Sequence, residues 1–194
     1  MDDDDPLALL KRDRDLARRA GDPWANLCVL ATYSGQRPEA RTLVLRDLDD
    51  RLAIFVNRTS PKSAHVERHP QVAVLLYLAS ASVQYRLNGV LEPVATHVVH
   101  ANWRARPRIP KVLDWLYRDH APQSAPIESR DALEALHADV ARRIGDDPAA
   151  PEEAIGFYIA PTTIERLELA ADRLHDRRHF TRIATGWRVD TLVP

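Results

Sequence analysis

The feature that most constrains the fold is a series of short β-type segments, each ended by turn residues. The segments are rich in valine, isoleucine, leucine and tyrosine, and most are separated by only a few polar, glycine or proline residues. We expect nine strands, at residues 26–33, 39–46, 51–57, 71–79, 82–94, 155–160, 162–169, 173–183 and 186–193. Strands joined by such short turns are mostly antiparallel. Because so many short strands would otherwise leave unpaired edges, the pattern favours a closed or split barrel.

Helical signals occur at three places along the chain. Asp5 can cap a first helix that Gly21 would stop, and Ser60 precedes a proline at the start of a short second helix. From 95 to 145 the pattern is helical, and its last helix is the most regular. The prediction is a single domain over 1–194, mainly β, with a helical insertion at about 95–145.

The charge balance argues against a protein that binds nucleic acid through a general basic field. Lysine plus arginine number 27 and aspartate plus glutamate 28, so any anion site must be local. The single Cys28 lies in an apolar run, which predicts a buried and inert thiol. The acidic start lacks a secretory pattern, and no apolar stretch reaches the roughly 18 residues of a membrane helix. We therefore expect a cytoplasmic protein that binds neither nucleic acid nor membrane.

Several common catalytic and metal motifs are missing from the sequence. The six glycines lie too far apart for a dinucleotide or P-loop fingerprint, and there is neither a nucleophile elbow nor a paired-cysteine site. His65 and His69, and likewise His97 and His100, have spacings that could face one metal ion. Because no set of carboxylate or cysteine ligands lies nearby, each pair is better explained as part of a solvated helix face. We predict no metal.

Two local cationic positions precede the helical insertion. Arg41 and Arg46 fall at opposite faces of the strand predicted at 39–46. Lys62 falls in the first turn of a helix, whose free N–H groups favour an anion. Taken singly, each of these residues could be an exposed edge charge that discourages sheet aggregation.

The segment RLHDRRHFTR, residues 173–182, adds a third cationic group. Alternate side chains of a strand share a face, so the odd-numbered residues from Arg173 to His179 would project from one side. Like charges in register repel each other unless the face is solvated or an anion binds there. Together with the two earlier positions, this segment favours a bound anion.

The order of these motifs resembles the pyridoxamine 5′-phosphate oxidase family. RTLVLR, FVNRTSPK, VQYRLNG, PQS, RLHDR and GWRVDTLVP follow one another as in that family, nearly end to end. RLHDR with a closing tryptophan strand is the most specific motif. The resemblance implies an FMN enzyme with a split-barrel fold that works as a homodimer. It also implies that the C-terminal strands, about 155–194, form part of the dimer and substrate region.

Carried over position by position, the resemblance implies two sets of contacts. Contacts to FMN would come from Arg41, Thr42, Leu43, Val44, Leu45, Arg46, Phe55, Val56, Ser60, Lys62, Gln84, Gln123, Ser124 and Arg177. Contacts to a small anionic substrate would come from Arg46, Asn102, Arg106, Arg173 and His175. Arg173 and His175 would be the catalytic pair beside the reacting carbon. The cationic face of Arg173, His175 and Arg177 would then be explained by FMN and an anionic substrate stacked against it, with His179 just beyond the site.

The sequence departs from the family pattern at several site positions. Asn102 and Pro110 stand where a tyrosine and a serine usually complete the substrate phosphate pocket, and Leu167 stands where a tryptophan lies near the flavin. Pro61 replaces an arginine that helps hold the FMN phosphate, and Arg46 stands where lysine is usual. The missing hydroxyls bear on the substrate more than on the cofactor, because each lost hydrogen bond costs about 1 kcal/mol.

The implied reaction is oxidation of pyridoxamine or pyridoxine 5′-phosphate, which are phosphorylated B6 vitamers, to pyridoxal 5′-phosphate. A hydride would pass to FMN, and oxygen would reoxidise the flavin to give hydrogen peroxide. Three alternatives stay open. The chain could be an FMN oxidoreductase of the same fold that acts on another substrate, such as a reduced aromatic compound. It could be a non-catalytic flavin or vitamin-phosphate binding protein or, most distantly, a nucleic-acid binder.

Overall fold

The computed structural model describes residues 5–194; residues 1–4, the acidic start of the predicted domain, lie outside the described residues. The described chain forms two compact units. Unit 1 comprises the chain up to Ile54, His69–Glu92 and Tyr158–Pro194, and unit 2 comprises Phe55–Arg68 and Pro93–Phe157. The single-domain organisation remains a prediction.

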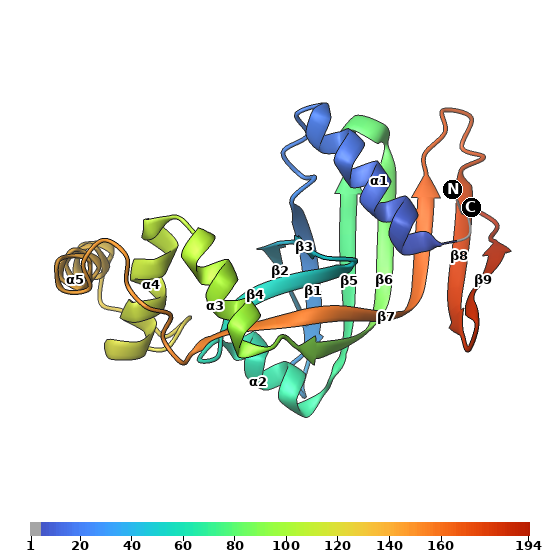
Figure 1. Ribbon diagram of the computed structural model, residues 1–194. Coiled ribbons are helices and arrows are strands. Elements are labelled where there is room, and N and C mark those ends of the chain that lie inside the picture. Colours follow the sequence, from blue (N-terminus) through green and yellow to red (C-terminus); the bar gives the residue numbers. More distant parts are fainter. Residues whose placement is uncertain (1–4) are drawn as a thin grey trace. The chain divides into compact units, whose positions relative to one another are not determined.

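Figure 1 shows the elements in chain order. The strands are β1 Leu27–Tyr33, β2 Pro38–Val44, β3 Arg46–Leu48, β4 Arg51–Asn57, β5 Gln71–Leu78, β6 Val83–Pro93, β7 Ala154–Glu168, β8 Asp176–Ile183 and β9 Gly186–Thr191. The helices are α1 Pro6–Arg19, α2 Pro61–Arg68, α3 Thr96–Ala105, α4 Arg108–Asp119 and α5 Arg130–Arg143, with a 3-10 turn η1 at Ala79–Ala81. Helices α3 to α5 form the predicted insertion between β6 and β7.

The strands join into one sheet in the order β2-β1-β5-β6-β7-β4-β3, and β8 and β9 extend it from β7. The β1–β2, β1–β5, β3–β4, β5–β6, β7–β8 and β8–β9 pairs are all antiparallel. The core follows the two-residue period of the strands, as in β5, where every second residue is buried. The antiparallel, mainly β architecture predicted from the sequence is confirmed.

The first helix forms as its end signals predict. Asp5 Oδ1 accepts a hydrogen bond from the Leu7 N–H at 3.0 Å, with proline at the first helical position. Gly21 follows the helix with φ +74°, the left-handed conformation that glycine adopts at helix ends. Leu10 is fully buried where α1 lies across β5 and β6 of unit 1 (Figure 1). Burial raises the pKa of Cys28, on β1, to about 11, and the thiol is buried as predicted.

The strand predicted at 39–46 is two strands rather than one. Leu45 is buried and interrupts it: its N–H donates to the Asn26 carbonyl at 2.9 Å, and its carbonyl accepts from Arg14 at 3.2 Å. Arg46 therefore begins β3, opposite Ala53 of β4, while Arg41 stays on β2. The prediction that Arg41 and Arg46 occupy opposite faces of one strand is wrong, because the buried Leu45 turns the chain between them.

The C-terminal strands also differ from the prediction. The segments 155–160 and 162–169 form one strand, β7, which continues through Pro161. In unit 1 its main chain lies so close to β6 that a Cβ atom at Gly89 would lie 2.1 Å from the Ala160 carbonyl oxygen. Only glycine permits this approach. β8 begins at Asp176 rather than at 173, so the premise that Arg173 and His175 alternate along a strand is wrong.

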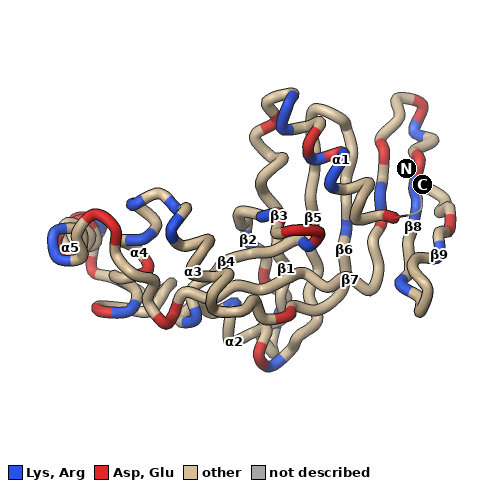
Figure 2. The backbone as a smooth tube through the Cα atoms, in the orientation of Figure 1, with Lys and Arg blue, Asp and Glu red and all other residues tan. Residues whose placement is uncertain are grey.

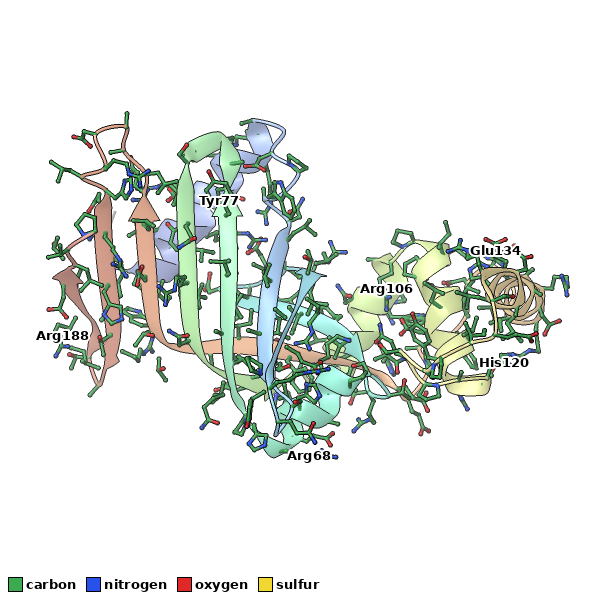
Figure 3. The ribbon with its side chains drawn as sticks, turned by 180° about the vertical axis from the view of Figure 1, so that it is seen from behind. Arg68, Tyr77, Arg106, His120, Glu134 and Arg188 are labelled. Carbon is green, nitrogen blue, oxygen red and sulfur yellow. The ribbon has the colours of Figure 1, made fainter. Side chains whose placement is uncertain are left out.

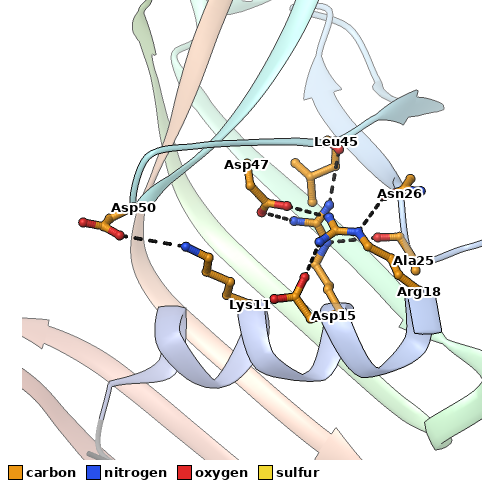
Figure 4. A network of polar contacts seen from close by, with 9 residues as sticks. Lys11, Asp15, Arg18, Ala25, Asn26, Leu45, Asp47 and Asp50 are labelled. Atoms are coloured by element: carbon orange, nitrogen blue, oxygen red, sulfur yellow. Dashed lines mark hydrogen bonds and ion pairs between the residues drawn. The ribbon is translucent and has the colours of Figure 1, made fainter. Parts of the chain in front are cut away.

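A buried ionic cluster joins α1 to the segment around Leu45 (Figure 4). Arg14 is fully buried; it donates to the Ala25 carbonyl at 3.0 Å and to the Leu45 carbonyl at 3.2 Å, and it pairs with Asp47. Arg18 Nη2 lies 2.5 Å from the other carboxylate oxygen of Asp47. Burial lowers the pKa of Arg14, and the Asp47 carboxylate opposes that shift. The cluster fixes the turn that carries Arg46.

Within unit 2, α4 and α5 pack around a small apolar core formed by Val112, Leu116 and Val140. Ser129 begins α5 with its hydroxyl accepting from the Ala132 N–H at 3.1 Å. Arg108 of α4 donates to the Ala141 carbonyl near the end of α5 at 2.6 Å. The regular helix predicted at the end of the insertion is therefore present and anchored.

Candidate functional site

The N-terminus of α2 in unit 2 carries two buried hydroxyl groups. Ser60 and Ser63 are each 1% exposed, and neither Oγ has a hydrogen-bond partner within residues 5–194. Ser60 thus precedes the helix as predicted but makes no capping bond through its side chain. A buried hydroxyl left unpaired costs about 1–3 kcal/mol, so such groups usually serve a ligand. With the helix N–H groups and Lys62 beside them, they fit the phosphate of a cofactor such as FMN.

Lys62 is tied to a second predicted cofactor residue. Its Nζ donates to Gln123 Oε1 at 3.1 Å, and the Gln123 N–H donates to Thr59 Oγ1 at 3.1 Å. The next residue, Ser124, has φ +73°, an uncommon conformation for a non-glycine residue. The structure therefore brings together Ser60, Lys62 and Gln123, three residues that the family resemblance predicts to contact FMN.

A polar chain continues from this cluster to a predicted substrate residue. Thr59 Oγ1 donates to Asn57 Oδ1 at 2.7 Å, and Asn57 Nδ2 donates to Asp114 Oδ1 at 2.9 Å. The other oxygen of Asp114 accepts from Arg106 Nη1 at 2.8 Å. The cluster of Ser60, Lys62 and Gln123 therefore lies at one end of a hydrogen-bonded chain within unit 2, and Arg106 of the insertion lies at the other end.

Arg106 does not present an uncompensated charge. Asp114 is 5% exposed and pairs with it, and the guanidinium also lies 5.1 Å from the centre of the Trp103 ring. Arg106, labelled in Figure 3, follows the last residue of α3 and precedes α4, which begins at Arg108. Asn102 on α3 and Pro110 on α4 are half-buried, as are Phe55 and Val56 on β4. The sequence prediction included Arg106 but missed the carboxylate that neutralises it.

The predicted cofactor strand lies in unit 1 on β2. Arg41 turns back over β1: its Nη1 donates to Thr32 Oγ1 at 2.7 Å and to the Leu30 carbonyl at 3.2 Å. Partial burial lowers the pKa of Arg41, and Glu39 at 3.6 Å opposes this. Along the strand Thr42 and Val44 are exposed, whereas Leu43 is half-buried and Leu45 buried. The exposed backbone and side chains of β2 are available to a planar ligand.

Gln84 lies on β6, opposite Tyr77 of β5. The following residue, Tyr85, is fully buried and donates to Asp13 Oδ2 at 2.7 Å, and Arg166 Nε donates to the same oxygen at 2.9 Å. Burial, reinforced by Asp13, raises the pKa of Tyr85. These hydrogen bonds connect β6 and β7 to α1 at the residue that follows Gln84.

The predicted catalytic pair lies in the turn before β8. The Ala170 N–H donates to His175 Nδ1 at 3.0 Å, so the ring proton of the neutral imidazole is on Nε2. Arg173 is exposed and has φ +68°, a left-handed conformation that costs a non-glycine residue about 1–2 kcal/mol. The Leu174 N–H donates to Asp172 Oδ1 at 3.0 Å and closes the turn. Both predicted residues are therefore held on one short, specifically shaped loop.

On β8, one of the cationic side chains pairs with a carboxylate of the same chain. Arg177 donates to Glu165 of β7 through Nε at 2.9 Å and Nη2 at 3.3 Å, and Glu165 raises the pKa of Arg177. Arg86 of β6 lies 3.6 Å from the same carboxylate. His179 lies opposite both Glu165 and Asp190 in the strand register. The sequence argument that favours a bound anion at this face is therefore incomplete, because Glu165 already neutralises part of the face.

Sequence reasoning missed four polar residues of these clusters: Asn57, Ser63, Asp114 and Glu165. Ser63 had a local signal, because SPKS places a second hydroxyl one helical turn from Ser60. Glu165 could have been paired with Arg177 only if the register of β7 and β8 were known. Asp114 is eight residues from Arg106, beyond the reach of a simple helix-spacing rule.

Residues 5–194 contain no group of three or more His, Cys, Asp or Glu side chains placed to hold a metal ion. Within this range no helix is long and apolar enough to cross a membrane. Figure 2 shows basic and acidic residues interspersed along the backbone rather than gathered by sign.

Comparison with known proteins assigns these features to a family. Residues 23–142 match the family described as Pyridoxamine 5′-phosphate oxidase, which is more than half of the chain. A pyridoxine/pyridoxamine 5′-phosphate oxidase of Burkholderia orbicola strain MC0-3 is 34% identical over 195 residues, covering 98% of this chain and 89% of that protein. The chain belongs to the pyridoxamine 5′-phosphate oxidase family.

Solved structures agree with this membership. PhzG from Burkholderia lata 383, crystallised with tetrahydrophenazine-1-carboxylic acid, aligns with a TM-score of 0.88 and 25% identity, covering 98% of this chain and 93% of that chain. A pyridoxamine 5′-phosphate oxidase-related, FMN binding protein from Nostoc punctiforme PCC 73102 aligns with a TM-score of 0.77 and 20% identity, covering 97% and 98%. The resemblance, the split-barrel fold class and the oxidoreductase class predicted from the sequence are confirmed.

Proposed function

We propose that this chain is an oxidase that removes a hydride from a small anionic substrate and uses oxygen as the final electron acceptor. The chain is an FMN-dependent oxidoreductase of the pyridoxamine 5′-phosphate oxidase family. The observation that carries the cofactor assignment is the buried, unpaired pair of hydroxyls at the start of α2, with Lys62 between them in sequence. Bound FMN would supply the two-electron redox chemistry, by which the substrate loses a hydride and a proton and oxygen gains two electrons and two protons to become hydrogen peroxide.

The residues proposed to hold the cofactor are those that the family resemblance implies. Ser60, Lys62 and Gln123 would contact its phosphate end, and Lys62 Nζ donates to Gln123 Oε1 at 3.1 Å. Main-chain and side-chain contacts would also come from Arg41 to Arg46. The further proposed contacts are Phe55, Val56, Gln84, Ser124 and Arg177.

His175 and Arg173 are proposed to act on the substrate. With Nδ1 occupied by the Ala170 N–H, His175 can offer its Nε2–H as a hydrogen-bond donor to a substrate oxygen or nitrogen. The exposed Arg173 guanidinium supplies positive charge from the same turn. Both groups would orient the donor carbon so that its hydride faces the cofactor.

The first candidate substrate is pyridoxine or pyridoxamine 5′-phosphate, with pyridoxal 5′-phosphate and hydrogen peroxide as products. Support comes from the relatives, which are named as oxidases of these compounds and match nearly the whole chain. Arg46 and Arg106 would contact the substrate phosphate, with Asn102 at the rim. Arg46 is exposed on β3 and could do so directly.

The second candidate is a reduced aromatic carboxylic acid. The specific observation in its favour is the ion pair of Arg106 with the buried Asp114, which lowers the positive charge available to a phosphate dianion. Pro110 adds no hydroxyl to that region. PhzG, whose structure holds tetrahydrophenazine-1-carboxylic acid, shares 25% identity with this chain. A monoanionic carboxylate would need less compensating charge than a phosphate.

One assay separates the candidates. Holoprotein is supplied in turn with pyridoxine 5′-phosphate, pyridoxamine 5′-phosphate and tetrahydrophenazine-1-carboxylic acid under air, and hydrogen peroxide is measured. Peroxide with the vitamers supports the first candidate, and peroxide with the acid alone supports the second. No turnover with any of them, despite bound FMN, would favour a flavin-binding protein without catalysis.

We further propose a homodimer in the cytoplasm. Unit 1 exposes Trp24, Val44, Leu75 and Tyr77 at 36–49% of their surfaces, and Leu75 lies opposite Val29 in the β1–β5 register. Figure 3 labels Tyr77 on β5 of this sheet. Exposed apolar side chains gathered in this way indicate a protein interface. Light scattering should give twice the chain mass, and Leu75→Glu should give a monomer, whereas Leu16→Glu on exposed α1 should not.

A further inference from the structure

We propose that Ser63, which the family resemblance does not assign, is a direct ligand of the FMN phosphate through its hydroxyl group. The proposal rests on the proposed function, because it requires that the chain bind FMN. It adds a third side chain to Ser60 and Lys62. The ligand chemistry is a phosphate monoester dianion, which only accepts hydrogen bonds from such donors.

The position of Ser63 in α2 directs its side chain to the helix N-terminus. Ser63 is the third residue of the helix, and its N–H donates to the Ser60 carbonyl at 3.0 Å. Cα–Cβ bonds in a helix tilt toward the N-terminus, so the Ser63 hydroxyl lies over the first turn. The same turn lies at the positive end of the helix dipole. A hydroxyl donor over the first turn of α2 is therefore well placed to bind an anion.

Burial without a partner is the second, independent observation. Ser63 is 1% exposed, and its Oγ makes no hydrogen bond to any residue from 5 to 194. Ser60 Oγ, one turn earlier, has the same two properties. A serine retained only for structure would normally bond a nearby carbonyl or N–H group. Two adjacent buried hydroxyls that do not bond the protein point to a common ligand.

Ser129 shows what a structural serine at a helix start looks like in the same unit. It precedes α5, and its Oγ accepts from the Ala132 N–H at 3.1 Å. The Ser129 hydroxyl already has a hydrogen-bond partner in the protein, so no ligand is needed to explain it. Replacement of Ser129 by alanine should therefore lower stability without changing cofactor affinity, whereas replacement of Ser63 should do the reverse.

The test compares FMN with riboflavin, which has the same ring and ribityl chain but no phosphate. Apoprotein is prepared from the wild type, Ser63→Ala and Ser129→Ala, and each is titrated with both flavins while flavin fluorescence is followed. Thermal unfolding of each apoprotein is measured in parallel. In Ser63→Ala the dissociation constant for FMN should rise about tenfold to hundredfold, the range for one hydrogen bond to a charged group, and that for riboflavin should stay unchanged.

The stability measurement excludes a merely structural explanation. Because Ser63→Ala removes an unpaired buried hydroxyl, its apoprotein should melt no lower than the wild type. Ser129→Ala should melt lower and keep the wild-type ratio of FMN to riboflavin affinity.

Three results would overturn the assignment of Ser63. The first is an unchanged FMN affinity in Ser63→Ala, and the second is an equal loss for FMN and riboflavin. The third is a Ser63→Ala apoprotein that melts below the wild type. A wild type that binds neither flavin would instead overturn the proposed function itself, and the Ser63 assignment with it.

Discussion

Arg177 of β8 and Glu165 of β7 form a two-point ion pair, with Nε 2.9 Å from Oε1 and Nη2 3.3 Å from Oε2. Arg86 also lies near this carboxylate, at 3.6 Å. Glu165 is therefore the internal counter-ion of two arginines on neighbouring strands. A cofactor that contacts Arg177 meets a guanidinium whose orientation is already fixed.

Loss of Glu165 should disturb this face in a measurable way. Glu165→Gln keeps the shape of the side chain but removes its charge, so Arg86 and Arg177 would repel each other without compensation. We expect the apoprotein to melt a few degrees lower, and added FMN or phosphate to restore part of the loss by supplying negative charge. Glu168→Gln, whose partner Arg166 keeps Asp13, is the matched control and should change little. A Glu165→Gln protein as stable as the wild type would contradict the counter-ion role.

The buried cluster of α1 should dominate stability. Asp47→Ala would leave the fully buried Arg14 without its carboxylate, and breaking a buried pair in this way costs about 3–5 kcal/mol. Urea unfolding of Asp47→Ala should show that loss. Asp50→Ala, which ends an exposed 4.0 Å pair with Lys11, should stay within about 0.5 kcal/mol of the wild type. Equal effects of the two substitutions would contradict the account.

Asp114 should limit the use of phosphorylated substrates. Asp114→Asn keeps a partner for Asn57 but frees the charge of Arg106, so KM for pyridoxine 5′-phosphate should fall about tenfold if a charge-assisted hydrogen bond of about 1.4 kcal/mol is gained. Asp147→Asn, the matched control, removes the charge that pairs with the buried Lys111 of α4 at 2.9 Å, and should leave KM unchanged. An unchanged KM in Asp114→Asn would show that Arg106 does not contact the phosphate.

The catalytic turn allows a matched pair of substitutions at Arg173. Both Arg173→Ala and Arg173→Gly remove the guanidinium and should lower kcat about a hundredfold while FMN stays bound. Because residue 173 has φ +68°, the glycine variant should be more stable than the alanine variant by about 1 kcal/mol. Full turnover in either variant would remove Arg173 from the mechanism. Equal stability would mean that the turn relaxes when the side chain is lost.

His175 provides a separate test of the same turn. His175→Ala should lower kcat about a hundredfold, because a fixed Nε2–H donor to the substrate is lost. The Ala170 N–H loses its partner at the same time, so thermal unfolding must be measured alongside. A variant that loses stability but keeps kcat would assign His175 to the loop rather than to the reaction.

Features that depend on local interactions could be predicted from the sequence, whereas features that depend on long-range contacts could not. Local signals were sufficient for α1, where Asp5 caps and Gly21 stops the helix, and for the alternating burial of β5. They failed at Leu45, which a strand pattern includes but which a buried contact with Arg14, 31 residues away, removes from the strand. They failed again at Arg173, where a turn closed by Asp172 precedes the strand.

The site divided in the same way. An anion contact at Lys62 was predicted because a helix start favours anions, whereas the one at Ser60 was implied by the family resemblance. Glu165 and Asp114 could not be predicted, since their partners Arg177 and Arg106 are set by strand register and helix packing rather than by spacing. The sequence was sufficient to single out the cationic residues of the site, but it did not identify the carboxylates that pair with them.

The most direct test of the central claim is the visible absorption spectrum of the purified protein before and after addition of FMN, with mass identification of any chromophore released by heat. The account predicts the visible absorption bands of a bound flavin, in an amount of about one per chain, and release of FMN rather than riboflavin. A protein that stays colourless after reconstitution, or that releases no phosphorylated flavin, would contradict the assignment of the α2 hydroxyls and of the oxidase function together.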